Sequence, residues 1–208
     1  MKTLAALFLS LACAACAVAG TYDDFFVAII RDDPGGVRAL IEKGVDANSV
    51  DAKGQPAANV AIQRDSGRAF EALLGAPGLD VNRLNTSGES PLMLAAIKGQ
   101  LEWCEKLLAR GAQVNQAGWS PLHYAASGPN PRIVELLLAR GAALDARSPN
   151  GSTPLMMAAR YGSEESVQLL LARGAVPSLR NERELDAAEF ARLGGRASLS
   201  DSLRRAKR

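Results

Sequence analysis

A pattern that restarts at regular intervals dominates this chain. It begins at residues 21, 54, 88, 118, 151 and 184. In four of these units a leucine follows the first glycine after 20 positions, with no gap needed: Gly54 to Leu74, Gly88 to Leu108, Gly118 to Leu138 and Gly151 to Leu171. Periods of 30 to 34 residues are typical of stacked two-helix units rather than of one closed core around an active site. The sequence therefore predicts an all-α repeat protein.

Three units share a longer motif with the pattern Gly-x-Ser/Thr-Pro-Leu-x-x-Ala-Ala. Its copies lie at residues 88–96, 118–126 and 151–159. Each copy leads to a leucine-rich segment that ends in Ala-Arg-Gly-Ala, at residues 109–112, 139–142 and 172–175. These stretches resemble the Gly-x-Thr-Pro-Leu-His-x-Ala-Ala motif and the end of the second helix of ankyrin repeats. The resemblance spans about residues 21–204 and implies a solenoid of helix-turn-helix units joined by finger loops.

The motif residues also have the chemistry of helix ends. A serine or threonine that can cap a helix precedes a proline that fits the first helical turn; the pairs are Ser90-Pro91, Ser120-Pro121 and Thr153-Pro154. Glycines follow each second helix, where a left-handed residue ends a helix at low cost; they are Gly111, Gly141 and Gly174. The alanine pairs of the motif keep one helical face small, so that neighbouring helices can approach closely.

The outer units fit the pattern less well. The unit that begins at Gly54 is a degenerate repeat, and the segments from Thr21 and from Glu184 are interpreted as the capping units that cover the open ends of a solenoid. We therefore expect one ankyrin-repeat domain over residues 20–208, with the first and last units as caps.

The first 19 residues have a different character. Lys2 precedes an apolar run from Leu4 to Val18, and Ala17-Val18-Ala19 provides the small-x-small pattern of signal peptidase sites. We predict a signal peptide over residues 1–19 that is cleaved to leave Gly20 first, and a protein exported to the periplasm of a Gram-negative bacterium. A buried or retained N-terminal helix and a lipoprotein remain alternatives, although neither Cys13 nor Cys16 follows the usual lipobox. No other segment is apolar enough to span a membrane.

Cleavage at this point would change the charge and the cysteine content. Without Lys2, 23 basic residues would face 22 acidic ones, a balance that argues against general nucleic-acid binding. Cys104 would be the remaining thiol, so no intramolecular disulfide is expected. It aligns with Val134 and Val167 of the next units and is therefore expected to be a buried apolar residue, with a redox role as the alternative.

Catalysis and metal binding find little support. The chain has one histidine, His123, at the motif position where the resemblance implies a structural imidazole. No cluster of histidines and cysteines suits zinc. Acidic pairs such as Asp32-Asp33 and Glu164-Glu165 are expected at helix starts or turns, and Gly35-Gly36 and Gly194-Gly195 are expected to join helices. We expect no enzyme activity, no metal and no cofactor.

Function is expected on the surface that varies between repeats. In a solenoid of this kind the finger loops and the first helices form a concave binding surface. The residues one, nine and ten positions after the first glycine of each repeat are expected to face this concave surface. Ser152, Ser127 and Gly128 are among them. From these positions and the adjoining fingers we predict a partner-binding set: Trp119, Tyr161, Arg160, Ile97, Lys98, Glu89, Arg64, Gln63, Arg83 and Arg147.

Two features indicate that the centre of the partner-binding site lies near Trp119. Trp119, Tyr161 and Ile97 combine aromatic and apolar side chains with nearby basic residues, as interface hot spots do. The finger before Trp119 is also three residues shorter than its neighbours, which predicts a notch, although scattered exposed residues and a neutral deletion explain the same pattern. We predict a monomeric protein-protein interaction module, with binding of a small ligand or of unfolded peptides, a chaperone-like role, as the alternative.

Overall fold

A computed structural model describes residues 20–206 of the chain. The predicted signal peptide, residues 1–19, lies outside the described residues. The described chain consists of helices, turns and loops, with a single isolated bridge between Val50 and Pro56. It divides into two compact units, unit 1 up to Gly88 and unit 2 from Glu89.

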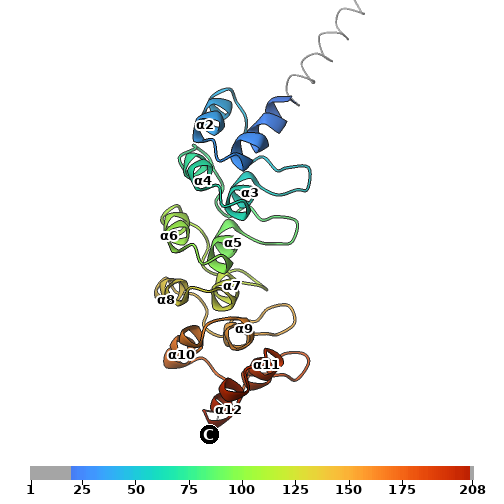
Figure 1. Ribbon diagram of the computed structural model, residues 1–208, viewed down its shortest axis with the longest axis vertical. Coiled ribbons are helices and arrows are strands. Elements are labelled where there is room, and N and C mark those ends of the chain that lie inside the picture. Colours follow the sequence, from blue (N-terminus) through green and yellow to red (C-terminus); the bar gives the residue numbers. More distant parts are fainter. Residues whose placement is uncertain (1–19, 207–208) are drawn as a thin grey trace, which may run out of the picture. The chain divides into compact units, whose positions relative to one another are not determined.

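The helices follow one another in pairs within each unit (Figure 1). In unit 1 a helix at residues 20–30 is followed by α2 (Pro34–Glu42), α3 (Ala57–Gln63) and α4 (Gly67–Leu74). Unit 2 holds the pairs α5 (Pro91–Ile97) and α6 (Leu101–Ala109), α7 (Pro121–Ser127) and α8 (Pro131–Ala139), α9 (Pro154–Tyr161) and α10 (Glu164–Ala172), and α11 (Ala187–Leu193) and α12 (Ala197–Arg205).

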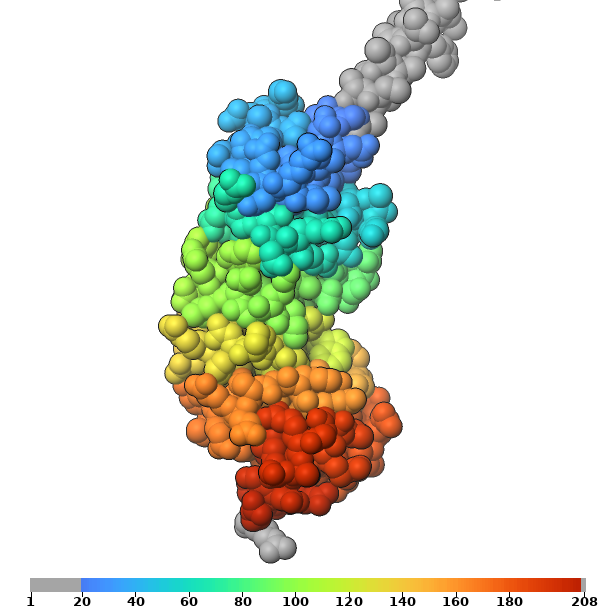
Figure 2. Space-filling model, in the orientation of Figure 1, coloured from blue at the N-terminus to red at the C-terminus, as the bar shows by residue number. Residues whose placement is uncertain are grey.

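Unit 2 stacks its helices in two rows. The first helices pack in the order α5, α7, α9 and α11, and α6, α8 and α10 pack behind them. Figure 2 shows the successive repeats of this unit as bands of colour from green to red. The predicted all-α, helix-turn-helix architecture is confirmed.

Two of the three predicted serine and threonine caps in unit 2 are present, at the starts of α5 and α9, whereas the Ser120 side chain accepts no cap hydrogen bond in α7. Ser90 Oγ accepts a hydrogen bond from the Met93 backbone N–H at 3.3 Å, and Thr153 Oγ1 accepts one from Met156 at 3.4 Å. The methionine sulfurs complete the cap, because the backbone N–H groups of Ser90 and Thr153 point to them at 3.4 and 3.3 Å. Thioether sulfur is only a weak acceptor. In α7 the same position holds His123.

Close helix stacking depends on glycine at the end of the first helices. A Cβ atom on Gly162, after α9, would lie 2.0 Å from the carbonyl oxygen of Ala126, and one on Gly128 would lie 2.8 Å from that of Ala96. No larger residue fits without moving the backbone of the neighbouring helix. The expectation that Gly128 faces the binding surface is therefore wrong, because Gly128 is buried against α5.

The start of α2 corrects another expectation. Gly35 and Gly36 do not join two helices; they form the first turn of α2, where both backbone N–H groups donate to Asp33 Oδ1 at 3.0 Å. Its neighbour Asp32 accepts from the Ala69 N–H at 2.8 Å and pairs with Arg68 at 3.0 Å, so it ties α4 to this turn. Both carboxylates thus serve helix starts, as expected for this pair.

The core repeats at fixed positions of the period. Four leucines with no exposed surface occupy the same place near the end of α4, α6, α8 and α10: Leu73, Leu107, Leu137 and Leu170. Cys104 is also fully buried, which confirms it as an apolar core residue. Burial, with a smaller effect of Glu105, raises the pKa of its thiol to about 12, so the thiol stays protonated near neutral pH.

Candidate functional site

His123 anchors the short finger of unit 2. Its Nδ1 accepts the backbone N–H of Ser120 at 3.2 Å, and the Ser120 hydroxyl lies 2.8 Å from the same nitrogen. Because a backbone N–H can only donate, Nδ1 is the unprotonated nitrogen, and Nε2–H donates to the carbonyl oxygen of Ser152 at 3.0 Å. Burial lowers the pKa of His123. The neutral ring therefore joins two successive fingers.

Trp119 packs on this fixed ring. Its indole meets the His123 imidazole edge to face, with 5.3 Å between the ring centroids and 78° between the planes. Asn115 ties the same finger to the next repeat, because its side chain donates to Gly141 at 2.9 Å and accepts from Ala143 at 2.8 Å. The half-buried Trp119 is thus held on a short, braced loop.

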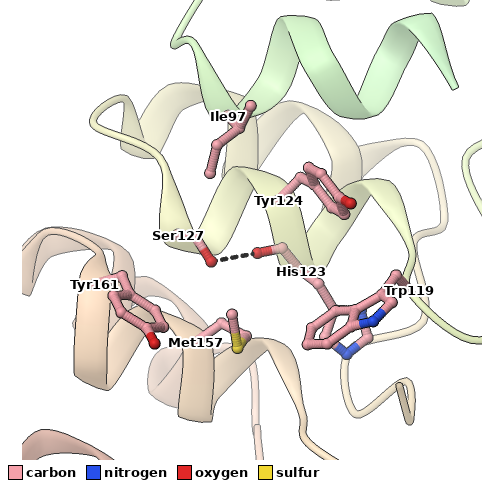
Figure 3. A pocket seen from close by; sticks show the side chains of 7 residues that line it. All are labelled: Ile97, Trp119, His123, Tyr124, Ser127, Met157 and Tyr161. Atoms are coloured by element: carbon pink, nitrogen blue, oxygen red, sulfur yellow. Dashed lines mark hydrogen bonds between the residues drawn. The ribbon is translucent and has the colours of Figure 1, made fainter. Parts of the chain in front are cut away.

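A hollow of about 430 Å³ lies beside Trp119 in unit 2. We call it the aromatic hollow, and Figure 3 shows the side chains that line it: Ile97, Trp119, His123, Tyr124, Ser127, Met157 and Tyr161. They come from α5, the short finger, α7 and α9, so the hollow crosses three repeats. Tyr161 is 56% exposed despite its aromatic ring. This volume lies within the usual range of small-ligand pockets, about 300–1,000 Å³.

Tyr124 connects the hollow to the finger before α5. Its hydroxyl donates to Glu89 Oε1 at 3.0 Å. Burial, assisted by this carboxylate, raises the pKa of Tyr124 well above its ordinary value. The Tyr124 ring is therefore neutral, and its hydrogen bond to Glu89 orients it at the wall of the hollow.

A second hollow of about 260 Å³ adjoins the first and shares Trp119, Met157 and Tyr161 with it. We call it the arginine hollow; its other lining residues are Asn150, Ser152, Arg160, Asn181, Arg183, Leu185, Phe190 and Leu193. The Arg160 guanidinium carbon lies 4.9 Å from the Tyr161 ring centroid, within the range of a cation–π contact. The two hollows together give a groove with an apolar part and a basic part.

The structure brings together part of the predicted binding set. Ile97, Trp119 and Tyr161 line the aromatic hollow, and Arg160 lines the arginine hollow. Lys98 follows α5 as its C-terminal cap and is half-buried.

Other predicted residues lie apart from the hollows. Arg147 holds two fingers together, since one of its nitrogens donates to the carbonyl oxygens of Gly151 and Arg180 at 2.7 and 2.9 Å. Gln63, Arg64 and Arg83 are exposed residues of unit 1. They line neither hollow, both of which belong to unit 2.

The register used to predict the surface missed two residues of the aromatic hollow, and a third residue, Ser152, is less exposed than it predicts. Tyr124 and Met157 line the aromatic hollow from the sixth position after the first glycine. Helical spacing indicates them, because Tyr124 precedes Ser127 by three residues and Met157 precedes Tyr161 by four. Ser152, expected on the surface, borders the arginine hollow but is almost fully buried, because its backbone carbonyl accepts from His123 and its N–H donates to Ser148 Oγ at 3.0 Å.

The described residues offer little for catalysis or metal binding. Within residues 20–206 no group of three histidine, cysteine or acidic side chains is placed to hold a metal ion. Over the same range, no helix combines the length and apolar content of a membrane span. His123 uses both ring nitrogens in structural hydrogen bonds.

Stacked helix pairs, finger loops and a groove on the side of the first helices define a repeat scaffold of the binding-module class. A family model for ankyrin repeats, described as three copies, matches residues 25–117 and 113–181. Because these matches cover most of the sequence, the chain belongs to the ankyrin-repeat family. Ankyrin repeats generally mediate protein–protein interaction and are typically non-enzymatic.

Proposed function

We propose that this chain, as a monomer, binds a partner protein through the face of unit 2 that holds the aromatic hollow. The observation that supports the proposal most is the meeting of Trp119, Tyr124 and Tyr161 around one open hollow. Tryptophan and tyrosine are enriched among residues that dominate binding energy, particularly where they border a pocket.

The geometry supports a prepared surface. Trp119 rests on an imidazole held at both nitrogens, and Tyr124 is oriented by Glu89. Side chains already held in place lose less conformational entropy when a partner binds. The buried alanines and leucines behind them supply a rigid support, so the surface can vary while the scaffold does not.

Affinity capture with a Trp119→Ala/Tyr161→Ala variant tests the proposal. Residues 20–208 would be used as bait in a periplasmic extract of the source organism, and captured proteins would be quantified by mass spectrometry. We expect a partner that the unchanged chain retains and the variant loses, because the two changes remove most of the aromatic wall.

Unit 1 provides a matched control. Gln55 and Arg64 occupy the positions of the period that Trp119 and Tyr161 occupy in their own repeats, so Gln55→Ala/Arg64→Ala is expected to retain the partner. Circular dichroism and the melting temperature of each variant would show that the fold is intact. Equal retention by both variants would move the binding site away from the aromatic hollow, and a partner lost only by the control would place it in unit 1.

The volume of the aromatic hollow also suits the alternative function, binding of a small ligand or of unfolded peptides. That function predicts weak binding of many unrelated chains, whereas a specific interaction predicts one or a few partners. The number of proteins lost together in the variant sample separates the two.

Export is a proposal of its own. Residues 1–19 have the charged start, apolar run and small-x-small end of a signal peptide, and we propose that cleavage after Ala19 releases the chain into the periplasm. The mass of the protein recovered from a periplasmic fraction is expected to match a chain that begins at Gly20. A mass that retains residues 1–19, or a lipid attached to a cysteine, would contradict it.

A further inference from the structure

Two arginines of the groove have no carboxylate partner among residues 20–206. Arg160 and Arg183 both line the arginine hollow, and neither forms an ion pair in this part of the chain. The Nε atom of Arg160 is buried and has no hydrogen-bond partner there. A buried donor without an acceptor is uncommon and costs free energy. The two guanidinium groups that line the hollow thus have no carboxylate within the described chain to neutralise their charge.

The charge of the groove changes from one hollow to the next. No carboxylate, lysine or arginine lines the aromatic hollow, whose one histidine, His123, is neutral, and no carboxylate lines the arginine hollow within the described chain. Guanidinium groups bind carboxylates through paired, charge-assisted hydrogen bonds, while the uncharged aromatic wall suits an apolar side chain. The Tyr161 ring, which contacts both hollows, lies against Arg160 and would hold its guanidinium in place.

The two hollows lie side by side on successive repeats. The aromatic hollow is centred on α7 and α9, and the arginine hollow on α9 and α11. Neighbouring packed helices are about 8–10 Å apart, and an extended chain advances about 3.3 Å per residue, so about three residues would span the step. One short segment in an extended conformation can therefore reach both hollows.

We propose that the groove binds an extended segment of the partner in which a bulky apolar side chain is followed, about three residues away, by a carboxylate. The apolar side chain enters the aromatic hollow between Trp119, Tyr124 and Tyr161. The carboxylate binds the guanidinium groups of Arg160 and Arg183, which line the arginine hollow. This inference rests on the proposed function and names the chemistry of the partner. A side chain of aspartate or glutamate and the C-terminus of a chain both provide this group.

Selection from random dodecapeptides displayed on phage tests the inference with residues 20–208 as the target. One library displays peptides within a longer chain and a second displays them with a free C-terminus, so enrichment in each distinguishes a side-chain carboxylate from a terminal one. We expect enriched clones to carry Phe, Leu, Met or Trp within a few residues of a carboxylate. Enrichment of apolar peptides without an acidic group, enrichment of basic peptides, or no enrichment would overturn the inference.

Synthetic peptides from the best clones allow the charge to be tested separately. Replacing the carboxylate by its amide is expected to weaken binding about tenfold or more, and Arg183→Gln is expected to do the same without affecting the fold, because Arg183 is exposed. Arg160→Gln serves as a second variant, read together with its melting temperature. The control is Arg132→Gln, an exposed arginine of α8 outside both hollows, which is expected to leave the affinity unchanged.

The outcome separates this inference from the proposed function. Affinity capture could identify a partner that requires Trp119 and Tyr161 while Arg183→Gln and the amide peptides bind as before. The proposed interaction surface would then be supported, and the proposed carboxylate of the partner would be ruled out. If neither capture nor display yields a ligand that depends on the aromatic hollow, both fail.

Discussion

Units 1 and 2 carry different surfaces on the same internal pattern. In unit 1 the first, ninth and tenth positions after Gly54 hold Gln55, Gln63 and Arg64, whereas in unit 2 the same positions supply Trp119, Ile97 and Tyr161. At the nineteenth position the difference disappears, since every one of the four central repeats has a fully buried leucine there. The comparison teaches that burial determines the scaffold and that recognition depends on the few positions that burial leaves free.

The largest effect is expected from breaking the shared scaffold. Leu73→Ala in unit 1 and Leu137→Ala in unit 2 should each lower the free energy of unfolding by about 2–5 kcal/mol, because both side chains are fully buried and leave a cavity. Urea denaturation followed by circular dichroism measures the change.

Trp119→Ala gives the contrast, because the indole is only half-buried and its loss is expected to cost less stability than either leucine. If Trp119→Ala proved more destabilising than Leu137→Ala, our division into scaffold and surface would be incorrect at this position.

A smaller effect is expected at the capping position, where unit 2 uses histidine once and methionine twice. The His123 pKa is lowered by burial, so the folded chain stays neutral there when the unfolded chain takes up a proton below about pH 6.5. Stability supplied by the neutral ring is therefore complete above this pH and decreases as the pH falls, at no more than about 1.4 kcal/mol per pH unit.

His123→Met places in α7 the residue that Met93 and Met156 provide in the neighbouring repeats. Because the chain has no other histidine, this variant isolates the contribution of His123 to the pH dependence of stability. The variant is expected to lose the hydrogen bond to Ser152 and so to be less stable at pH 8. Its free energy of unfolding should nevertheless depend less on pH between 7 and 5 than that of the unchanged chain, by up to about 2 kcal/mol. Parallel pH profiles for the two proteins would show that His123 does not titrate as its burial requires.

The sequence predicts the scaffold well because each of its features has a local cause. Ser90 and Thr153 cap helices through their own hydroxyl groups, and Gly141 adopts a left-handed conformation with φ of 84°. Gly35 and Gly36 were misplaced because a glycine pair is typical of a turn, while the Asp33 side chain and Pro34 extend α2 through them.

The groove was predicted only in part, because it depends on contacts between repeats. The sequence pointed to Trp119, Tyr161 and Ile97 from their register alone. It did not reveal that Ser152 is buried to receive His123, or that Arg183 of the next finger shares a hollow with Arg160. Such contacts join residues about 30 positions apart, and neither helix propensity nor periodicity specifies them.

The smallest change in stability is expected at Cys104, where the equivalent residues are Phe70 in unit 1 and Val134 and Val167 in unit 2. Cys104→Val keeps a small apolar side chain in a closed core and should alter the free energy of unfolding by less than about 1.5 kcal/mol. The unchanged thiol, buried and with its pKa raised to about 12, should react with a disulfide reagent only when its surroundings open.

That reactivity can decide whether the two units open separately. Leu137→Ala weakens the unit that contains Cys104 and is expected to raise the rate of thiol labelling by about thirtyfold or more, the factor that corresponds to about 2 kcal/mol. Leu73→Ala weakens unit 1 and is expected to raise that rate less, because stability in a repeat protein is the sum of local and nearest-neighbour contributions. Equal acceleration by both variants would mean that the units open together, and the contrast between them would then be one of surface alone.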